Sequence, residues 1–225
     1  MPTTRSPQRR ADDGRRTELV NAARTVIARD GVAAATTRRI AQEAGLPHGT
    51  FHYWFSGKEE LFEELIAEVL QELADAATAA ADASGPDASV LDMLRAAWNV
   101  VENDEKNQPG HQLAFYELTA YALRTPALRD LARRQYQAYR DIAAAIAASW
   151  MRTRHSDLPG GSDALMRLMA VLFDGITLAW LADPDGTKPD ELFVLIDTLV
   201  EAAIGRPRDA DSPGPTSSAT PHPGS

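Results

Sequence analysis

The side chains best suited to chemistry lie in one short stretch, and that chemistry is hydrogen bonding to nucleic acid. His48, Gly49, Thr50, His52 and Tyr53 fall within six consecutive residues. At a helix start, free backbone N–H groups favour a phosphate or a base-edge acceptor, and a threonine can offer its hydroxyl and methyl to a base pair. Gly49 has no Cβ, so the backbone there could approach a duplex closely. We therefore expect these five residues to contact DNA.

The surrounding sequence, TTRRIAQEAGLPHGTFHYWFSGK at residues 36–58, predicts the helices that would position them. Ile40, Ala41 and Ala44 recur at helical spacing, Gly45 breaks the pattern, and the chain restarts at Leu46-Pro47. Phe51 and Phe55 then form a second apolar stripe. Two short helices around a glycine turn are typical of a helix-turn-helix, whose second helix enters the major groove.

The flanks of this motif add candidate contacts to the DNA backbone. Thr37, Arg38 and Arg39 begin the first helix of the pair, which crosses the sugar-phosphate backbone, and Lys58 opens the next helix. We expect these four residues to help position the domain. The two arginines could instead be a solvated face, and Lys58 an ordinary surface lysine.

The aromatic residues Phe51, Trp54 and Phe55 are expected in the core rather than stacked on bases. His48 and His52 have the i, i+4 spacing of metal ligands, but the sequence lacks the glutamate of H-E-x-x-H, and no third ligand is near in sequence. We expect neither a metal nor a cofactor. No G-x-S-x-G, phosphate loop, dinucleotide fingerprint or cysteine is present, so the sequence does not predict an enzyme.

Charge is distributed unevenly along the 225 residues. The net charge is −9, yet residues 1–58 hold ten basic and five acidic residues, and the remainder holds 13 basic and 27 acidic residues. The first part is therefore +5 and the second −14, which suggests that one end meets nucleic acid. The arginine-rich N-terminus lacks a following apolar segment, and no run of eighteen apolar residues occurs. We expect a cytoplasmic protein without a membrane span.

Helical periodicity and turn residues predict an all-α fold. The predicted helices cover about 15–30, a pair within 36–55, 56–82, 88–105, 109–123, 126–153, 162–183 and 189–204. Ser56 and Glu59 have the spacing of a capping box at the start of the long helix. Four regions are predicted: a disordered basic arm (1–14) with Arg5, Arg9 and Arg10, the helix-turn-helix domain (15–58), a helical domain (59–205) and a disordered tail (206–225).

The larger helical domain offers a dimer interface and a pocket. The last two helices have wide apolar stripes, which could be ordinary core but suit a four-helix dimer interface; we expect there Leu168, Leu172, Ile176, Trp180, Leu195 and Leu199. Gly175, in the middle of its helix, would permit close approach of a neighbouring helix. Aromatic and polar residues on several helices could also surround a ligand, although packing explains each of them singly. The candidate ligand contacts are Trp98, Glu102, Phe115, Tyr116, Tyr121, Tyr139 and Phe173.

Residues 15–58 resemble the N-terminal domain of the TetR (tetracycline repressor) family of bacterial transcription regulators. The resemblance is carried by TTRRIAQEAGL, by GTFHYWF, and by the Ser-Gly-Lys-Glu-Glu-Leu sequence that opens the long helix. His52 and the Pro47-His48 pair depart from the usual pattern, so the operator sequence does not follow by analogy. The resemblance implies a homodimer that binds double-stranded DNA, with a C-terminal domain that pairs and often binds a small molecule.

The sequence therefore predicts a repressor that a small-molecule effector releases from a palindromic operator. The alternative is a helical adaptor that binds other proteins and no nucleic acid, because long amphipathic helices also serve that role. Binding to DNA at low salt distinguishes the two.

Overall fold

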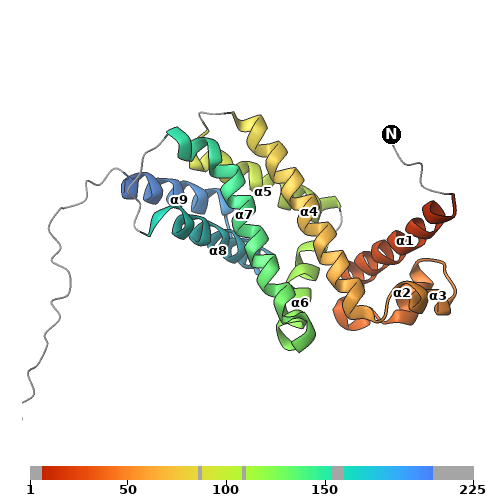
Figure 1. Ribbon diagram of the computed structural model, residues 1–225. Coiled ribbons are helices and arrows are strands. Elements are labelled where there is room, and N and C mark those ends of the chain that lie inside the picture. The colour runs from red at the N-terminus through yellow and green to blue at the C-terminus, as the bar shows by residue number, and fades with distance from the viewer. Residues whose placement is uncertain (1–6, 86–87, 108–109, 154–159, 205–225) are drawn as a thin grey trace, which may run out of the picture.

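The computed structural model describes residues 7–85, 88–107, 110–153 and 160–204, and every regular element in these ranges is helical (Figure 1). In chain order the elements are α1 (Pro7–Asp30), η1 (Val32–Ala34), α2 (Thr37–Glu43), α3 (His48–Trp54), α4 (Lys58–Ser84), α5 (Val90–Asn107), α6 (His111–Arg124), η2 (Pro126–Leu128), α7 (Arg129–Thr153), α8 (Gly161–Ala182) and α9 (Pro189–Ile204). The predicted all-α class is confirmed.

Two local predictions were wrong. Helix α1 begins at Pro7, so residues 7–14 are helical rather than disordered, while residues 1–6 and the tail from 206 lie outside the described residues. The predicted capping box also has a different partner. The N–H and hydroxyl of Ser56 both donate to Glu60, at 2.9 Å each, and not to Glu59. The cap is displaced by one residue because α4 begins at Lys58, after an extended Gly57.

The helix-turn-helix follows from local signals in the chain. Thr36 caps α2, since its hydroxyl accepts the N–H of Arg39 at 3.2 Å. Gly45 then takes a positive φ of 67°, a conformation that favours glycine, and turns the chain toward α3. Phe51 and Phe55 are fully buried on the inner side of this turn, as predicted. Burial of this one face leaves the other side of α3 exposed.

Two apolar clusters hold the fold together. The first joins α1, α2, α3 and the start of α4 to α6 and the start of α7, through residues such as Leu118 and Leu131. The second lies among α5, the end of α7, α8 and α9. Helix α4 runs from one cluster toward the other (Figure 1). The core of the N-terminal part therefore extends beyond residue 58 and includes side chains from the larger helical part.

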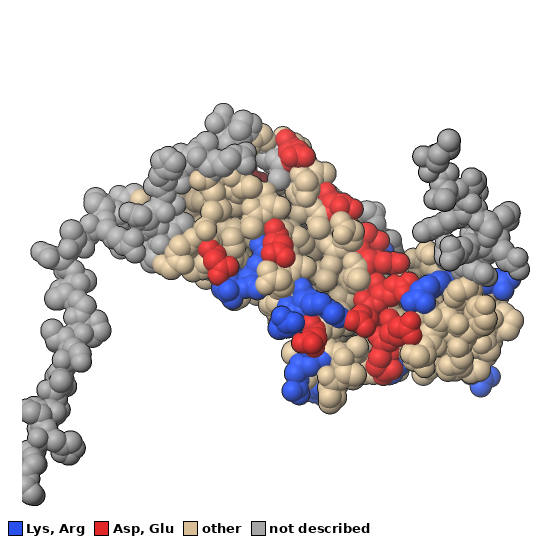
Figure 2. Space-filling view, viewed as in Figure 1, with Lys and Arg blue, Asp and Glu red and all other residues tan. Residues whose placement is uncertain are grey.

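Ion pairs fix α1 against α4. The guanidinium of Arg16 pairs with Glu60 and Glu64, donates to the carbonyl of Trp54 at 2.8 Å and lies 4.3 Å from the centre of the Phe55 ring. Farther along, Arg24 pairs with Glu72 at 2.9 Å. These carboxylates belong to a band of acidic side chains that covers α4 (Figure 2).

Candidate nucleic-acid interface and ligand cavity

Helix α3 presents the predicted base-reading residues on its outer side. His48, Gly49, His52 and Tyr53 are exposed, and the Tyr53 side chain reaches 75% exposure, whereas Phe51 on the opposite side is 0% exposed. Thr50 is half-buried. A Cβ at Gly49 would meet nothing within 4 Å, so the space beside this backbone is open. The Tyr53 ring contacts the Trp54 ring edge-on, with 4.7 Å between the ring centres, but leaves most of its surface in water.

Helix α2 places its two arginines differently. Arg38 is exposed and has no ion-pair partner among the described residues. Arg39 pairs with Asp30 at 2.7 Å, which links α2 to the end of α1, and Arg29 pairs in turn with Glu43 at 2.9 Å. Thr37 is half-buried at the first turn of α2. Of the two cations on α2, Arg38 is the one that a phosphate can reach without breaking an existing pair.

Lys58 does not extend freely into solvent. Its ammonium group lies 4.8 Å from the centre of the Tyr121 ring and 5.9 Å from that of Phe62, within the range of cation–π attraction. The Tyr121 hydroxyl donates to the adjacent Glu59 at 2.9 Å. In this position Lys58 joins the start of α4 to α6, and its contact with phosphate stays a prediction.

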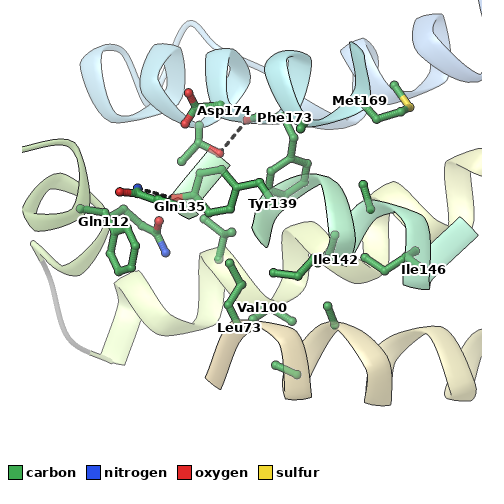
Figure 3. A pocket seen from close by; sticks show the side chains of 18 of the residues that line it. Leu73, Val100, Gln112, Gln135, Tyr139, Ile142, Ile146, Met169, Phe173 and Asp174 are labelled. Atoms are coloured by element: carbon green, nitrogen blue, oxygen red, sulfur yellow. Dashed lines mark hydrogen bonds between the residues drawn. The ribbon is translucent and has the colours of Figure 1, made fainter. Parts of the chain in front are cut away.

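A cavity of about 480 Å³ lies within the larger helical part, between α4, α5, α6, α7 and α8. This volume falls in the range of small-molecule sites. Figure 3 shows Phe173 and Asp174 of α8 on one side, with Leu73 of α4 and Val100 of α5 opposite. Gln112, Gln135 and Tyr139 gather at one end of the view, and Ile146 and Met169 at the other. The cavity therefore has a polar end and an apolar end.

Hydrogen bonds order the polar end. The Tyr136 hydroxyl donates to the Asp174 carboxylate at 2.6 Å, and the Tyr116 hydroxyl donates to the Asp174 backbone carbonyl at 2.8 Å. Gln135, only 2% exposed, donates to the Tyr139 hydroxyl at 2.9 Å and accepts from Thr119 at 3.0 Å. These bonds fix three phenol rings beside one carboxylate.

The same environment keeps the phenols protonated. Burial raises the pKa of Tyr116 and of Tyr139 far above the ordinary value, with the Asp174 charge adding to the effect. The hydrogen bond to Asp174, together with burial, raises the pKa of Tyr136 to about 12.

The structure divides the residues that were expected around a ligand. Phe115, Tyr116, Tyr139 and Phe173 line the cavity. The other three do not, and their placement at the cavity was wrong. Trp98 packs in the second apolar cluster, where its ring centre lies 5.2 Å from that of Trp180. Glu102 lies outside the cavity lining. Tyr121 faces Phe62 and Glu59 at the start of α4. Ligand binding by the first four stays a prediction.

Sequence reasoning missed Gln135 and Asp174 as members of the site. Gln135 and Tyr139 are four residues apart on α7 and so share a face, a spacing that could have indicated the pair. Asp174 interrupts the apolar stripe of α8, and a charge within such a stripe is the signal that could have identified it.

Helix α6 contacts both functional regions. Its residues Phe115, Tyr116 and Thr119 line the cavity, while Glu117 accepts the backbone N–H of Val32 in η1 at 2.6 Å. At the start of the helix, Gly110 has a φ of 94° and lies so close to α1 that a Cβ would overlap the carbonyl oxygen of Ala28. A displacement of α6 by a ligand would therefore act directly on the base of the helix-turn-helix.

Helices α8 and α9 leave an apolar surface exposed. Leu168, Leu195 and Leu199 of the predicted interface are exposed, Leu199 to 61%, but Ile176 is only 8% exposed and packs within its own subunit. Its inclusion in the interface was wrong, because the stripe of α8 divides between core and surface. Leu172 and Trp180 are half-buried against the second cluster. The surface also includes Val171, Leu178, Leu192 and Val194, and a Cβ at Gly175 would meet nothing within 4 Å.

By length and mean hydropathy (1.6), α8 alone among the described helices could cross a membrane, whereas the sequence predicted no membrane span. Its sequence includes Asp163, Arg167 and Asp174. Such a helix is weak evidence for a membrane protein, because an apolar helix that packs against another protein surface has the same composition.

Comparison with known proteins finds matches over most of the chain. Residues 19–65 match the family model described as bacterial regulatory proteins, tetR family, and residues 88–206 match the model described as tetracyclin repressor-like, C-terminal domain. The HTH-type nicotine-responsive transcriptional repressor HdnoR of Paenarthrobacter nicotinovorans is 31% identical over 194 residues, which cover 85% of this chain and 95% of the relative.

Solved structures agree with the sequence comparisons. The multidrug binding protein EbrR complexed with imidazole is 25% identical, with a TM-score of 0.63 over 88% of this chain and 98% of the other. The same protein complexed with malachite green is 25% identical, with a TM-score of 0.62 over 82% of this chain and 97% of the other.

Proposed function

This chain belongs to the TetR family of bacterial regulatory proteins, and we propose from that premise that it is a homodimeric repressor which a small molecule releases from a palindromic operator. The family regulates transcription rather than catalysing a reaction. The alternative of a helical adaptor without nucleic acid does not fit this membership.

The observation that carries the proposal is the outer side of α3. Exposed His48, His52 and Tyr53, with an unobstructed backbone at Gly49, lie on a helix whose other side is anchored by Phe51. A rigid short helix with polar and aromatic groups on its free side suits direct reading of base edges. Arg38 on α2, which forms no ion pair within the described part of the chain, supplies a cation for the flanking phosphates.

A second copy of the chain explains the apolar surface of α8 and α9. Leu168, Leu195 and Leu199 would be covered by the same residues of the partner, because an isologous interface is self-complementary. Two α3 helices held by such a dimer would meet two half-sites of a palindrome about one helical turn apart. Covering this surface would also remove exposed apolar side chains of α8, such as Leu168 and Val171, from water.

The cavity is the site at which a small molecule would control binding to the operator. HdnoR is named as nicotine-responsive, and EbrR was solved with imidazole and with malachite green, which supports a small-molecule effector for this chain. Helix α6 contacts both the cavity and η1, so a ligand that favours one position of α6 also favours one position of the helix-turn-helix. Release from DNA then follows by a shift in population between two states of the dimer.

The experiment begins with selection of bound fragments from the source genome, followed by measurement of operator affinity as a function of salt. Arg38→Glu should weaken operator binding by about tenfold or more. The plot of log affinity against log salt concentration should also become shallower, by about 0.9 in slope for each phosphate that the variant no longer neutralises. Arg133→Glu is the matched control, since Arg133 is an exposed arginine of α7 and the change in charge is the same. Equal binding by the Arg38 variant and the wild-type protein would contradict the proposal.

A further inference from the structure

The charge of the cavity lining is unbalanced. Among its described residues, three carboxylates (Glu72, Asp104 and Asp174) face one arginine, Arg24. Arg24 is already paired with Glu72 at 2.9 Å, and Asp104 lies 3.3 Å from the ring nitrogen Nδ1 of His111. Asp174 accepts a hydrogen bond from a phenol, and no basic side chain in the described part of the chain pairs with it. Within those described residues, Asp174 is thus the lining carboxylate with neither an arginine nor a histidine beside it.

Aromatic rings surround the same end of the cavity. Tyr116 is tied to the backbone of Asp174, Phe173 precedes Asp174 on α8, and the rings of Tyr136 and Tyr139 lie 5.6 Å apart at 66°. The faces of such rings carry partial negative charge and attract a cation. The phenols are neutral at neutral pH, so the rings attract a cation without themselves acting as its counter-ion.

We propose that the effector is an organic cation with an apolar body, whose charged group lies among Tyr116, Tyr139 and Phe173 with Asp174 as its counter-charge. This inference rests on the proposed function, because an effector is here a small molecule that changes the affinity of the protein for its operator. The apolar body would occupy the end lined by Ile142, Ile146 and Met169 (Figure 3). The cavity thus offers separate environments for the two parts of one amphiphilic molecule.

An organic anion does not suit this lining. It would meet the Asp174 carboxylate, and the arginine that could balance it is already engaged by Glu72 and lies 4.0 Å from Glu68. A charge that enters a low-dielectric cavity without a partner is strongly disfavoured. A neutral apolar molecule would fit the apolar end but would gain nothing from Asp174, so affinity for matched cationic and neutral probes separates the two cases.

The test is calorimetric titration of the full-length protein with two matched pairs of probes. Phenyltrimethylammonium and tert-butylbenzene share a shape and differ in charge. Tetraphenylphosphonium and tetraphenylborate form a larger pair of opposite charge. We expect at least one cation to bind about tenfold or more tightly than its matched probe, a margin typical of a desolvated cation–π site with a counter-charge. Equal affinities within both pairs, preference for the borate, or failure of both cations to bind would overturn the proposal.

The variant that decides the role of the carboxylate is Asp174→Asn, with its folding checked by thermal unfolding. It should remove most of the preference for the cation. Asp163→Asn is the matched control, because Asp163 lies on the same helix, is exposed, pairs with Arg167 and does not line the cavity. A cation preference that survives Asp174→Asn unchanged would contradict the assignment.

Operator binding, measured in parallel, separates the two proposals. A protein that binds its operator but not the cations retains the proposed function, and the cationic effector is then excluded. A protein that binds the cations but no genomic fragment retains the cavity assignment, and the proposed function is then excluded. Where both hold, the bound cation should lower operator affinity.

Discussion

The carboxylate of Glu117 on α6 accepts the backbone N–H of Val32 in η1 at 2.6 Å, across 85 residues of sequence. Glu117 also packs against Gly31, where a Cβ would lie 2.9 Å from its carboxylate oxygen. The two residues that precede Glu117, Phe115 and Tyr116, line the cavity. One turn of α6 therefore contacts both the candidate ligand site and the base of the helix-turn-helix.

Replacement of Glu117 with Ala should weaken both stability and control. The buried N–H of Val32 would lose its acceptor, which lowers the free energy of unfolding by about 1–3 kcal/mol. The variant should also show a smaller change in operator affinity on addition of effector. Glu117→Gln is the control, because its amide oxygen can still accept the bond. Urea unfolding and operator titration measure the two effects, and an unaltered response in the Ala variant would show that coupling passes elsewhere.

Replacement of Gly49 with Val should weaken binding to every DNA sequence without unfolding the protein. The added side chain enters open space in the free protein but separates α3 from the duplex in the complex. Tyr53→Ala, at a residue that is 75% exposed, should instead reduce affinity for the selected operator more than for unrelated DNA. Fluorescence anisotropy with both DNAs distinguishes the two variants. Wild-type affinity in Gly49→Val would mean that α3 docks in another orientation.

Replacement of Leu199 with Glu should dissociate the proposed dimer. Leu199 is 61% exposed on α9, so the charge is tolerated in a monomer but would be buried against the partner's surface. Light scattering after size-exclusion chromatography measures the mass. Leu123→Glu is the matched control, since Leu123 is 58% exposed on α6 and is not one of the predicted interface residues. Dissociation by both variants, or by neither, would contradict the assigned interface.

Alkaline pH should destabilise the protein through its cavity tyrosines. The folded state holds the proton of Tyr136 up to a pKa of about 12, above the ordinary value of 10.0. Between pH 10 and 12 the folded protein therefore binds more protons than the unfolded chain. The contribution of this group to the free energy of unfolding is full below pH 10 and is lost as the pH rises toward 12. Absorbance titration of the phenols should show Asp174→Asn shifting one of them back toward ordinary behaviour. A titration curve identical to wild type would exclude Asp174 as the cause.

Much of the fold could be predicted from the sequence because its signals are local. Thr36, Gly45, and the spacing of Phe51 and Phe55 each act within one or two turns, and the helix-turn-helix follows from them. The start of α1 was wrong because composition favoured disorder over residues 7–14, where the chain nevertheless continues the helix. The Ser56 cap was displaced because a single extended residue, Gly57, shifts the register by one.

The cavity could be predicted only in part because periodicity identifies an apolar face but not the element that covers it. Trp98 and Phe173 both lie on inward faces, yet Trp98 meets Trp180 and Phe193 while Phe173 also reaches the cavity. Tyr121 points to Phe62 because α6 packs against the start of α4, a relation between distant segments that no local pattern contains. The stripe of α8 divides between core and surface for the same reason.

The acidic band along α4 has a consequence for the encounter with a duplex. In Figure 2 it borders the small N-terminal part, whose net charge has the opposite sign. A polyanion that approaches from the side of α4 is repelled, whereas one that approaches α3 head-on is not. The band thus biases the orientation in which a duplex arrives, and at roughly 1 M salt, where the screening length is about 3 Å, this bias disappears.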